Sequence, residues 1–126
     1  MTDSRCFLDS SIWLGYLIGN MPKARPIIDS EENTLLTSII SIHEVYKRIN
    51  KIGKNPKMAI QFIEENSIVF GIDKIIAINS VKNCEKYALH TIDSLVYTSA
   101  EKNNAIFITA DNDFRKTPNT IILPAR

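Results

Sequence analysis

Cysteine and histidine are scarce in this sequence, with two residues of each type among 126. Cys6 lies in a strand-like apolar run and Cys84 lies on a helical stripe, and neither is spaced near His43 or His90. Zinc sites need closely spaced thiols and imidazoles, so this pattern argues against one. We expect two buried, reduced thiols instead, which is typical of a reducing compartment and predicts a cytoplasmic location.

Long apolar runs and a strong charge imbalance are also absent. No segment approaches the ~20 apolar residues of a membrane span, and the first residues lack the apolar core of a signal peptide, so we expect no membrane association. The net charge of +1 neither requires nor excludes a nucleic-acid partner, because a balanced total can hide a local basic patch. The length and the 44% hydrophobic content predict a single domain over residues 1–126.

Short apolar runs alternate with helical patterns along the chain. The expected strands are 4–8, 34–37, 67–72, 105–109 and 120–123. The first expected helix starts at Ser10 or Ser11, and a short one can form within 23–32. A long helix that ends at Gly53 comes next, and three more start at the caps Asn55, Asp73 and Thr91. This alternation predicts an α/β fold, with a parallel sheet of about five strands covered by helices on both faces.

Apolar stripes predict which helix faces are buried. The stripe of the helix that ends at Gly53 is Ile42, Val45, Tyr46, Ile49 and Ile52. The stripe of the helix after Asp73 is Ala77, Ile78, Val81, Cys84 and Ala88. Trp13 and Tyr16 also match core spacing, so we expect them to pack rather than to stack on bases.

Five acidic residues follow strands or begin helices near one edge of the predicted sheet. Asp9 ends the first strand, Asp111 and Asp113 follow the fourth, and Asp93 and Glu44 lie in first helical turns. In an open parallel sheet, ligands bind outside the carboxyl ends of the strands. Several carboxylates without cysteine or histidine suit a hard cation with oxygen ligands, Mg²⁺ or Mn²⁺. The pattern therefore predicts a divalent-metal site.

Each aspartate also has a simpler interpretation. Asp9 could begin a helix cap, and Asp93 could be a first-turn acid favoured by the helix dipole. Asp111 and Asp113 could be turn residues. What favours a shared function is their joint placement, because independent caps and turns have no reason to converge on one sheet edge.

Glu44 has the strongest alternative interpretation. Ser41 and Glu44 match a capping box, in which the glutamate bonds back to the serine backbone. Glu44 could also pair with Lys47 or Arg48, which lie three and four residues further on. Taken alone, Glu44 is better explained by a cap or a salt bridge than by a metal site.

The ordered blocks "FLDSSIWL", "TSIISIHEV", "TIDSLVYTSAEKNNAIFITADNDF" and "ILP" resemble the PIN-domain family, and specifically the VapC-type ribonuclease toxins. The resemblance covers nearly the whole chain, and its most specific part is the helix-borne aspartate followed by a strand and T-x-D-x-D-F. It implies a three-layer α/β/α sandwich with the first strand central in the sheet. It also implies an Mg²⁺- or Mn²⁺-dependent endoribonuclease.

The resemblance also implies roles for individual residues. Catalytic residues would be Asp9, Glu44, Asp93 and Asp111. Of these, Asp9, Asp93 and Asp111 would hold the metal, and Glu44 would position the attacking water or act as base. Auxiliary residues would be the fifth acid, Asp113, and the supporting hydroxyls of Thr109 and Ser10.

Contacts with partners are less readable from sequence. Arg115 and Lys116 follow the acidic turn closely enough to meet an RNA phosphate. A second basic cluster is better explained as a solvated helix face, and consists of Lys47, Arg48, Lys51, Lys54 and Lys57. The resemblance implies a homodimer and a small antitoxin protein that lays a helix and a tail across the active-site groove, bordered by helices at 10–19 and 39–52.

Two other functions remain open from the sequence, and two phosphate-handling domains are disfavoured. The chain could be a PIN-fold module that binds RNA or protein without turnover, or a stand-alone RNA-processing nuclease. A haloacid-dehalogenase-like phosphatase would need a second aspartate at position 11, where the chain has Ser11. A receiver domain would need paired acids before Asp9, and these are not convincing.

Overall fold

The computed structural model of the protein describes residues 4–124. Strands and helices alternate along it, as the sequence predicts. The strands are β1 (Ser4–Leu8), β2 (Asn33–Ser38), β3 (Ile68–Phe70), β4 (Ile106–Thr109) and β5 (Thr120–Ile122). The helices are α1 (Ser10–Ile18), η1 (Pro22–Ala24), α2 (Arg25–Ile28), α3 (Ile39–Lys51), α4 (Pro56–Asn66), α5 (Lys74–Tyr87), α6 (Thr91–Lys102) and η2 (Asn112–Phe114), of which η1 and η2 are 3₁₀ turns.

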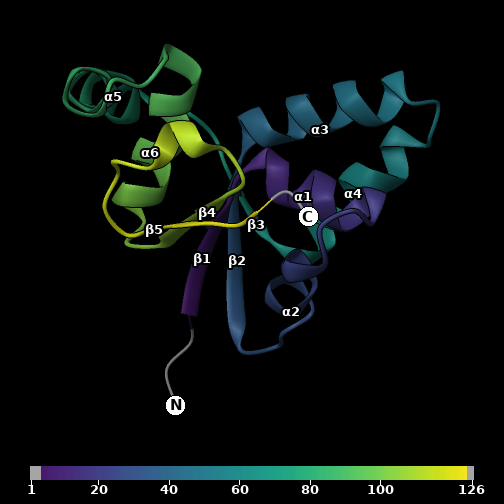
Figure 1. The fold of residues 1–126 in the computed structure, drawn as a ribbon. Coiled ribbons are helices and arrows are strands. Elements are labelled where there is room, and N and C mark those ends of the chain that lie inside the picture. Colours follow the sequence, from purple (N-terminus) through teal and green to yellow (C-terminus); the bar gives the residue numbers. More distant parts are fainter. Residues whose placement is uncertain (1–3, 125–126) are drawn as a thin grey trace.

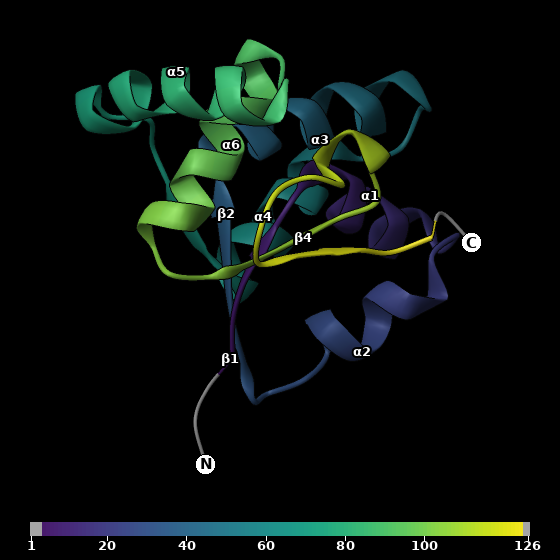
Figure 2. The ribbon, with the colours of Figure 1, turned by 60° about the vertical axis from the view of Figure 1, so that its left-hand side comes forward.

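The five strands form one parallel sheet in the order β3-β2-β1-β4-β5. Helices α1 to α4 cover one face of this sheet, and α5 and α6 cover the other (Figures 1 and 2). The prediction of a three-layer α/β/α sandwich with a central first strand is confirmed. Within residues 4–124, no helix is both long enough and apolar enough to cross a membrane.

Strand β1 supplies side chains to the hydrophobic cores on both faces of the sheet. Cys6 and Leu8 pack with the buried Trp13 of α1 on one face. Phe7, which alternates with them, packs with Phe107 and Tyr97 on the other face. Burying each large apolar side chain contributes about 1.5 to 3 kcal/mol. The central strand is therefore held from both sides, and so is the residue that follows it.

Helix α1 begins at Ser10, which is one of the two predicted starts. Asp9 occupies the N-cap position in extended conformation, but its carboxylate makes no capping hydrogen bond. The helix ends at Gly19, which has φ of 85°, and the backbone N–H groups of Gly19 and Asn20 both donate to the carbonyl of Gly15. Neither serine is the N-cap residue, so that part of the prediction was wrong, and the Asp9 side chain is left free for other contacts.

Two other caps differ from the prediction, although the expected helix start at residue 39 is confirmed. Helix α3 begins at Ile39 with Ser38 as its N-cap, because the Ser38 hydroxyl accepts from the N–H of Ile40. Ser41 therefore lies inside the helix, buried, so the capping box with Glu44 does not form and Glu44 lies in the second turn. Helix α6 is preceded by His90 as N-cap, and Thr91 is its first residue. The caps at Asn55 and Asp73 form as predicted.

Helix α5 buries a different face from the predicted apolar stripe. Ile78 and Val81 are 60% and 56% exposed, whereas Asn83 is buried. The Asn83 side-chain amide donates to Thr98 at 2.8 Å and to Glu101 at 3.1 Å, both on α6. These polar contacts set the rotation of α5 against α6, and apolar periodicity alone contains no information about them.

Candidate metal centre

The five predicted acids come from four elements that meet at the carboxyl ends of the central strands. Asp9 directly follows β1, and Asp111 follows β4. Strands β1 and β4 are parallel neighbours, so their ends lie side by side. Asp93 lies in the first turn of α6, and Glu44 lies in the second turn of α3. The fold thus brings all five acids to one edge of the sheet.

Three of these carboxylates form a compact group. One carboxylate oxygen from each of Asp93, Asp111 and Asp113 lies within 4.8 Å of the other two. Asp93 and Asp111 are half-buried, and Asp113 is exposed. Oxygen donors this close suit a hard divalent cation such as Mg²⁺ or Mn²⁺. The structure places the predicted auxiliary acid, Asp113, inside this group.

Asp9 lies deeper than this group and is held by two hydroxyls. Its Oδ2 accepts a hydrogen bond from Thr109 Oγ1 at 2.7 Å and from Ser11 Oγ at 3.0 Å. Both side-chain hydrogen bonds to this carboxylate within residues 4–124 end on Oδ2, so Asp9 Oδ1 has no side-chain donor there. Burial raises the pKa of Asp9, and the two hydroxyl bonds oppose that rise. This arrangement orients one carboxylate oxygen and leaves the other for a ligand.

The same two hydroxyls also hold the loop after β4. Thr109 Oγ1 accepts from the backbone N–H of Asp111 at 3.0 Å, and Ser11 Oγ accepts from that of Ala110 at 2.9 Å. Ser11 therefore makes the contacts predicted for Ser10, whose side chain makes no hydrogen bond within the described chain. The sequence offered two adjacent serines, and only the rotation of α1 decides between them.

Asp111 combines two functions that the sequence offered as alternatives. Its Oδ1 accepts from the backbone N–H of Asp113 at 2.9 Å, which caps the short turn η2. It also belongs to the compact group of three carboxylates. The cap fixes the orientation of the Asp111 carboxylate, so the turn supports the site and does not replace it.

Glu44 does not form the predicted salt bridges. The ion pairs within residues 4–124 are Arg25 with Asp29 and Lys102 with Asp73, and neither involves Glu44. Glu44 is half-buried, and its charge contributes to raising the pKa of both Asp9 and Asp93. Glu44 therefore belongs to the electrostatic field of the other acids rather than to a surface ion pair.

Asp93 carries the clearest electrostatic signal of the site. Burial, together with the charges of Asp111, Asp9, Asp113 and Glu44, raises its pKa to about 6. Like charges this close destabilise one another unless a cation lies between them. A cation bound beside Asp93 would therefore relieve this repulsion and lower the pKa of Asp93.

This raised pKa predicts how the stability of the metal-free protein depends on pH. The folded protein binds the Asp93 proton more tightly than the unfolded chain, whose aspartate pKa is 3.8. Stability from this group is therefore greatest below pH 3.8 and falls as pH rises to about 6, by about 1 to 2 kcal/mol after allowing for solvent screening.

Thermal unfolding in a chelator at several pH values measures this slope. Asp93→Asn removes the titrating group, so we expect a flatter pH profile and a higher melting temperature than the parent at pH 7. Added Mn²⁺ should raise the melting temperature of the parent more at pH 7 than at pH 5. Equal slopes in the parent and the variant would contradict the electrostatic strain assigned to Asp93.

Arg115 and Lys116 lie beside the acids, as predicted. They line a small cavity of about 160 Å³ together with His90 and Asp113. Both are exposed, and Arg115 Nη1 donates to the carbonyl of Asn112 at 3.2 Å. Their positive charges are therefore accessible on one side of the carboxylates.

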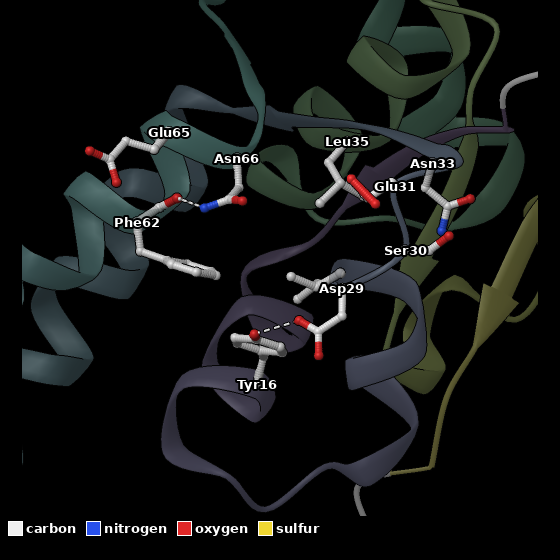
Figure 3. Close-up of a pocket in the computed structure, with 10 residues that line it drawn as sticks. Tyr16, Asp29, Ser30, Glu31, Asn33, Leu35, Phe62, Glu65 and Asn66 are labelled. Carbon is white, nitrogen blue, oxygen red and sulfur yellow. Dashed lines mark hydrogen bonds between the residues drawn. The ribbon is translucent and has the colours of Figure 1, made fainter.

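A separate cavity of about 530 Å³ lies at the opposite, amino-terminal edge of the sheet, beside the start of β2 (Figure 3). Two of its carboxylates already have partners: Asp29 accepts from the Tyr16 hydroxyl at 2.6 Å, and Glu65 accepts from Gln61 at 3.1 Å. Phe62 stacks on Tyr16, with ring centroids 5.4 Å apart. None of the predicted site residues lines this cavity, so it is not the candidate metal centre.

Comparisons of this chain with known protein families and solved structures agree with the observed fold. The sequence matches the family model described as PIN domain over residues 6–119. A comparison with curated protein sequences finds no significant match.

Three solved structures resemble the chain closely in shape. A toxin-antitoxin complex from Klebsiella pneumoniae has 20% identity and a TM-score of 0.76, over 92% of this chain and 95% of that chain. VapBC2 from Rickettsia felis, bound to a promoter DNA fragment, has 16% identity and a TM-score of 0.73, over 95% and 98% of the two chains. The Mycobacterium tuberculosis toxin VapC20, which cleaves the sarcin-ricin loop, has 14% identity and a TM-score of 0.75, over 94% and 99%. At these low identities the likeness shows the fold alone.

Proposed function

Because this chain belongs to the PIN domain family, we propose that it is a metal-dependent endoribonuclease that hydrolyses RNA phosphodiester bonds. The observation that carries the proposal is the group of Asp93, Asp111 and Asp113, whose carboxylate oxygens lie within 4.8 Å of one another. The deeper carboxylate of Asp9 and the charge of Glu44 complete an acidic site that is short of positive charge.

The proposed chemistry assigns a role to each acid. Asp9, Asp93 and Asp111 would hold Mg²⁺ or Mn²⁺, and Asp113 lies close enough to Asp93 and Asp111 to assist them. A bound divalent cation polarises a phosphoryl oxygen and lowers the pKa of the attacking water. Glu44 would orient that water and accept its proton while the new P–O bond forms and the bond to the leaving oxygen breaks, and the leaving oxygen would take a proton from solvent. Thr109 and Ser11 keep the Asp9 carboxylate oriented.

Cleavage of a labelled single-stranded RNA tests this function directly. We expect cleavage with Mg²⁺ or Mn²⁺, loss of cleavage in a chelator, and recovery when excess metal is restored. A second purification with unrelated chromatography should keep activity and protein together. Metal binding without any turnover would contradict the nuclease and would favour a PIN-fold binding module.

We also propose a protein partner, an oligomeric state and a cellular location for the nuclease. The nuclease acts as the toxin of a type II toxin–antitoxin pair, as a homodimer and as a single domain. Two of the similar solved structures are described as toxin-antitoxin or VapBC assemblies, which supports an antitoxin partner. The unpaired Cys6 thiol is buried, which supports a reducing cytoplasm. Expression without and with a neighbouring small reading frame distinguishes a toxin from a stand-alone nuclease.

A further inference from the structure

Helix α3 presents a basic face that starts at the acidic site. The residues of this face recur every three or four positions, so they share one side of the helix. They are Ile40, His43, Glu44, Lys47, Arg48 and Lys51, and with Ile92 of α6 they line a cavity of about 650 Å³. Seven residues separate Glu44 from Lys51, which is about 10 Å along the helix axis. The face therefore leads away from the acids along one groove.

The cations of this groove are not neutralised by protein anions. Lys47, Arg48 and Lys51 are exposed, and the ion pairs within residues 4–124 include none of them. The groove also has apolar walls at Ile40 and Ile92, which a plain solvated helix face does not need. Three free cations above an apolar wall suit a ligand with phosphate charges and a flat organic surface.

The acids lie between this groove and the small cavity on the other side. Glu44 lines the groove, and Asp113 lines the small cavity with His90, Arg115 and Lys116. The start of α6 connects the two, because His90 faces the small cavity, Ile92 lines the groove and Asp93 belongs to the carboxylate group. Positive charge thus flanks the acidic site on both sides.

We propose that a single RNA strand crosses the start of α6, with phosphates on one side of the cleaved bond bound by Lys47, Arg48 and Lys51. Phosphates on the other side contact Arg115 and Lys116. Ile40 and Ile92 contact the sugars or bases between them. This inference rests on the proposed nuclease function and adds the path of its substrate. The structure thereby favours RNA binding over the solvated face that the sequence suggested for the α3 cations.

The test compares two triple variants with the same change in charge. One removes the groove cations, with Lys47→Ala, Arg48→Ala and Lys51→Ala. The control, with Lys23→Ala, Lys74→Ala and Lys82→Ala, removes exposed lysines that line neither cavity. Binding of a fluorescent single-stranded RNA is measured in a chelator, so that it is not cleaved, over a range of salt concentrations. Circular dichroism and melting temperature establish that both variants are folded.

The groove variant should bind RNA about 10- to 100-fold more weakly at about 0.1 M salt, and the slope of log affinity against log salt should fall by about two. The control should stay within about two-fold of the parent. In cleavage assays the groove variant should raise KM and leave kcat nearly unchanged.

The outcomes separate this inference from the nuclease proposal. A parent that cleaves RNA, with a groove variant that binds RNA as well as the control does, overturns the path and leaves the nuclease standing. A parent that binds RNA through these cations but never cleaves it supports the path and contradicts the nuclease. A parent that does not bind RNA at all overturns both.

Discussion

Asp9→Asn should reduce metal-dependent RNA cleavage by about 1000-fold or more and leave the protein folded. The amide oxygen can still accept the hydrogen bonds from Thr109 and Ser11, so the end of β1 keeps its contacts. The substitution removes the buried negative charge that a divalent cation needs, and a neutral amide is a much weaker ligand. Losing stabilisation of charge in the transition state typically costs several kcal/mol. Single-turnover cleavage at saturating Mn²⁺ measures the loss.

A matched control comes from the other edge of the sheet. Asp29→Asn also neutralises one aspartate, but Asp29 is exposed and bonds to the Tyr16 hydroxyl far from the strand ends. This control should cleave RNA within about two-fold of the parent. In a chelator, the melting temperature of Asp9→Asn should lie at or above that of the parent, because burial destabilises the Asp9 charge. An Asp9→Asn protein that cleaves RNA within ten-fold of the parent would disprove the site.

The strands and their acids could be predicted from sequence because buried parallel strands have a simple pattern. Strand β1 spans Ser4–Leu8 as expected, and β4 spans Ile106–Thr109 within the expected run. The first two residues after such a strand lie at the sheet edge whatever their neighbours are. The positions of Asp9 and Asp111 therefore follow from local pattern and topology together.

Helix rotation and helix start could not be predicted in the same way. Ser38 rather than Ser41 caps helix α3, because both are capping residues and only the end of β2 decides between them. The choice of Ser11 over Ser10 depends on how α1 is rotated against β4. The buried face of α5 depends on the hydrogen bonds of Asn83 to α6. Each outcome is set by a polar tertiary contact between residues distant in the chain or by the end of a preceding strand.

The grouping of the acids was also only partly predictable. The family resemblance implied Asp9, Asp93 and Asp111 as the metal ligands, with Asp113 as an auxiliary acid. In the structure Asp113 joins Asp93 and Asp111, because the turn η2 folds its carboxylate back beside the strand end. Asp9 lies behind them, buried and bonded to hydroxyls. A turn of three residues decides this arrangement, and spacing in sequence does not describe it.

Thr109→Val should weaken metal binding and cleavage about 10- to 100-fold, although Thr109 has no carboxylate. Its hydroxyl donates to Asp9 Oδ2 at 2.7 Å and accepts from the backbone N–H of Asp111 at 3.0 Å. Valine has nearly the same shape, so the buried position is filled but both hydrogen bonds are lost. The orphaned Asp111 N–H and the less solvated Asp9 charge should lower the free energy of unfolding by about 1 to 3 kcal/mol.

Thr109→Ser separates orientation of the carboxylate from packing. Serine keeps the hydroxyl and loses a methyl group, which costs about 1 kcal/mol of stability in a fully buried site. If Thr109 acts by orienting Asp9, the serine variant should be less stable than the parent yet bind Mn²⁺ and cleave RNA nearly as well.

The valine variant should also need a higher pH for half-maximal Mn²⁺ binding, because the Thr109 hydroxyl bond lowers the pKa of Asp9. Titration calorimetry with Mn²⁺ across pH measures both effects. Equal losses of Mn²⁺ affinity in the serine and valine variants would show that Thr109 acts by packing, and the hydroxyl would then have no part in holding the Asp9 carboxylate.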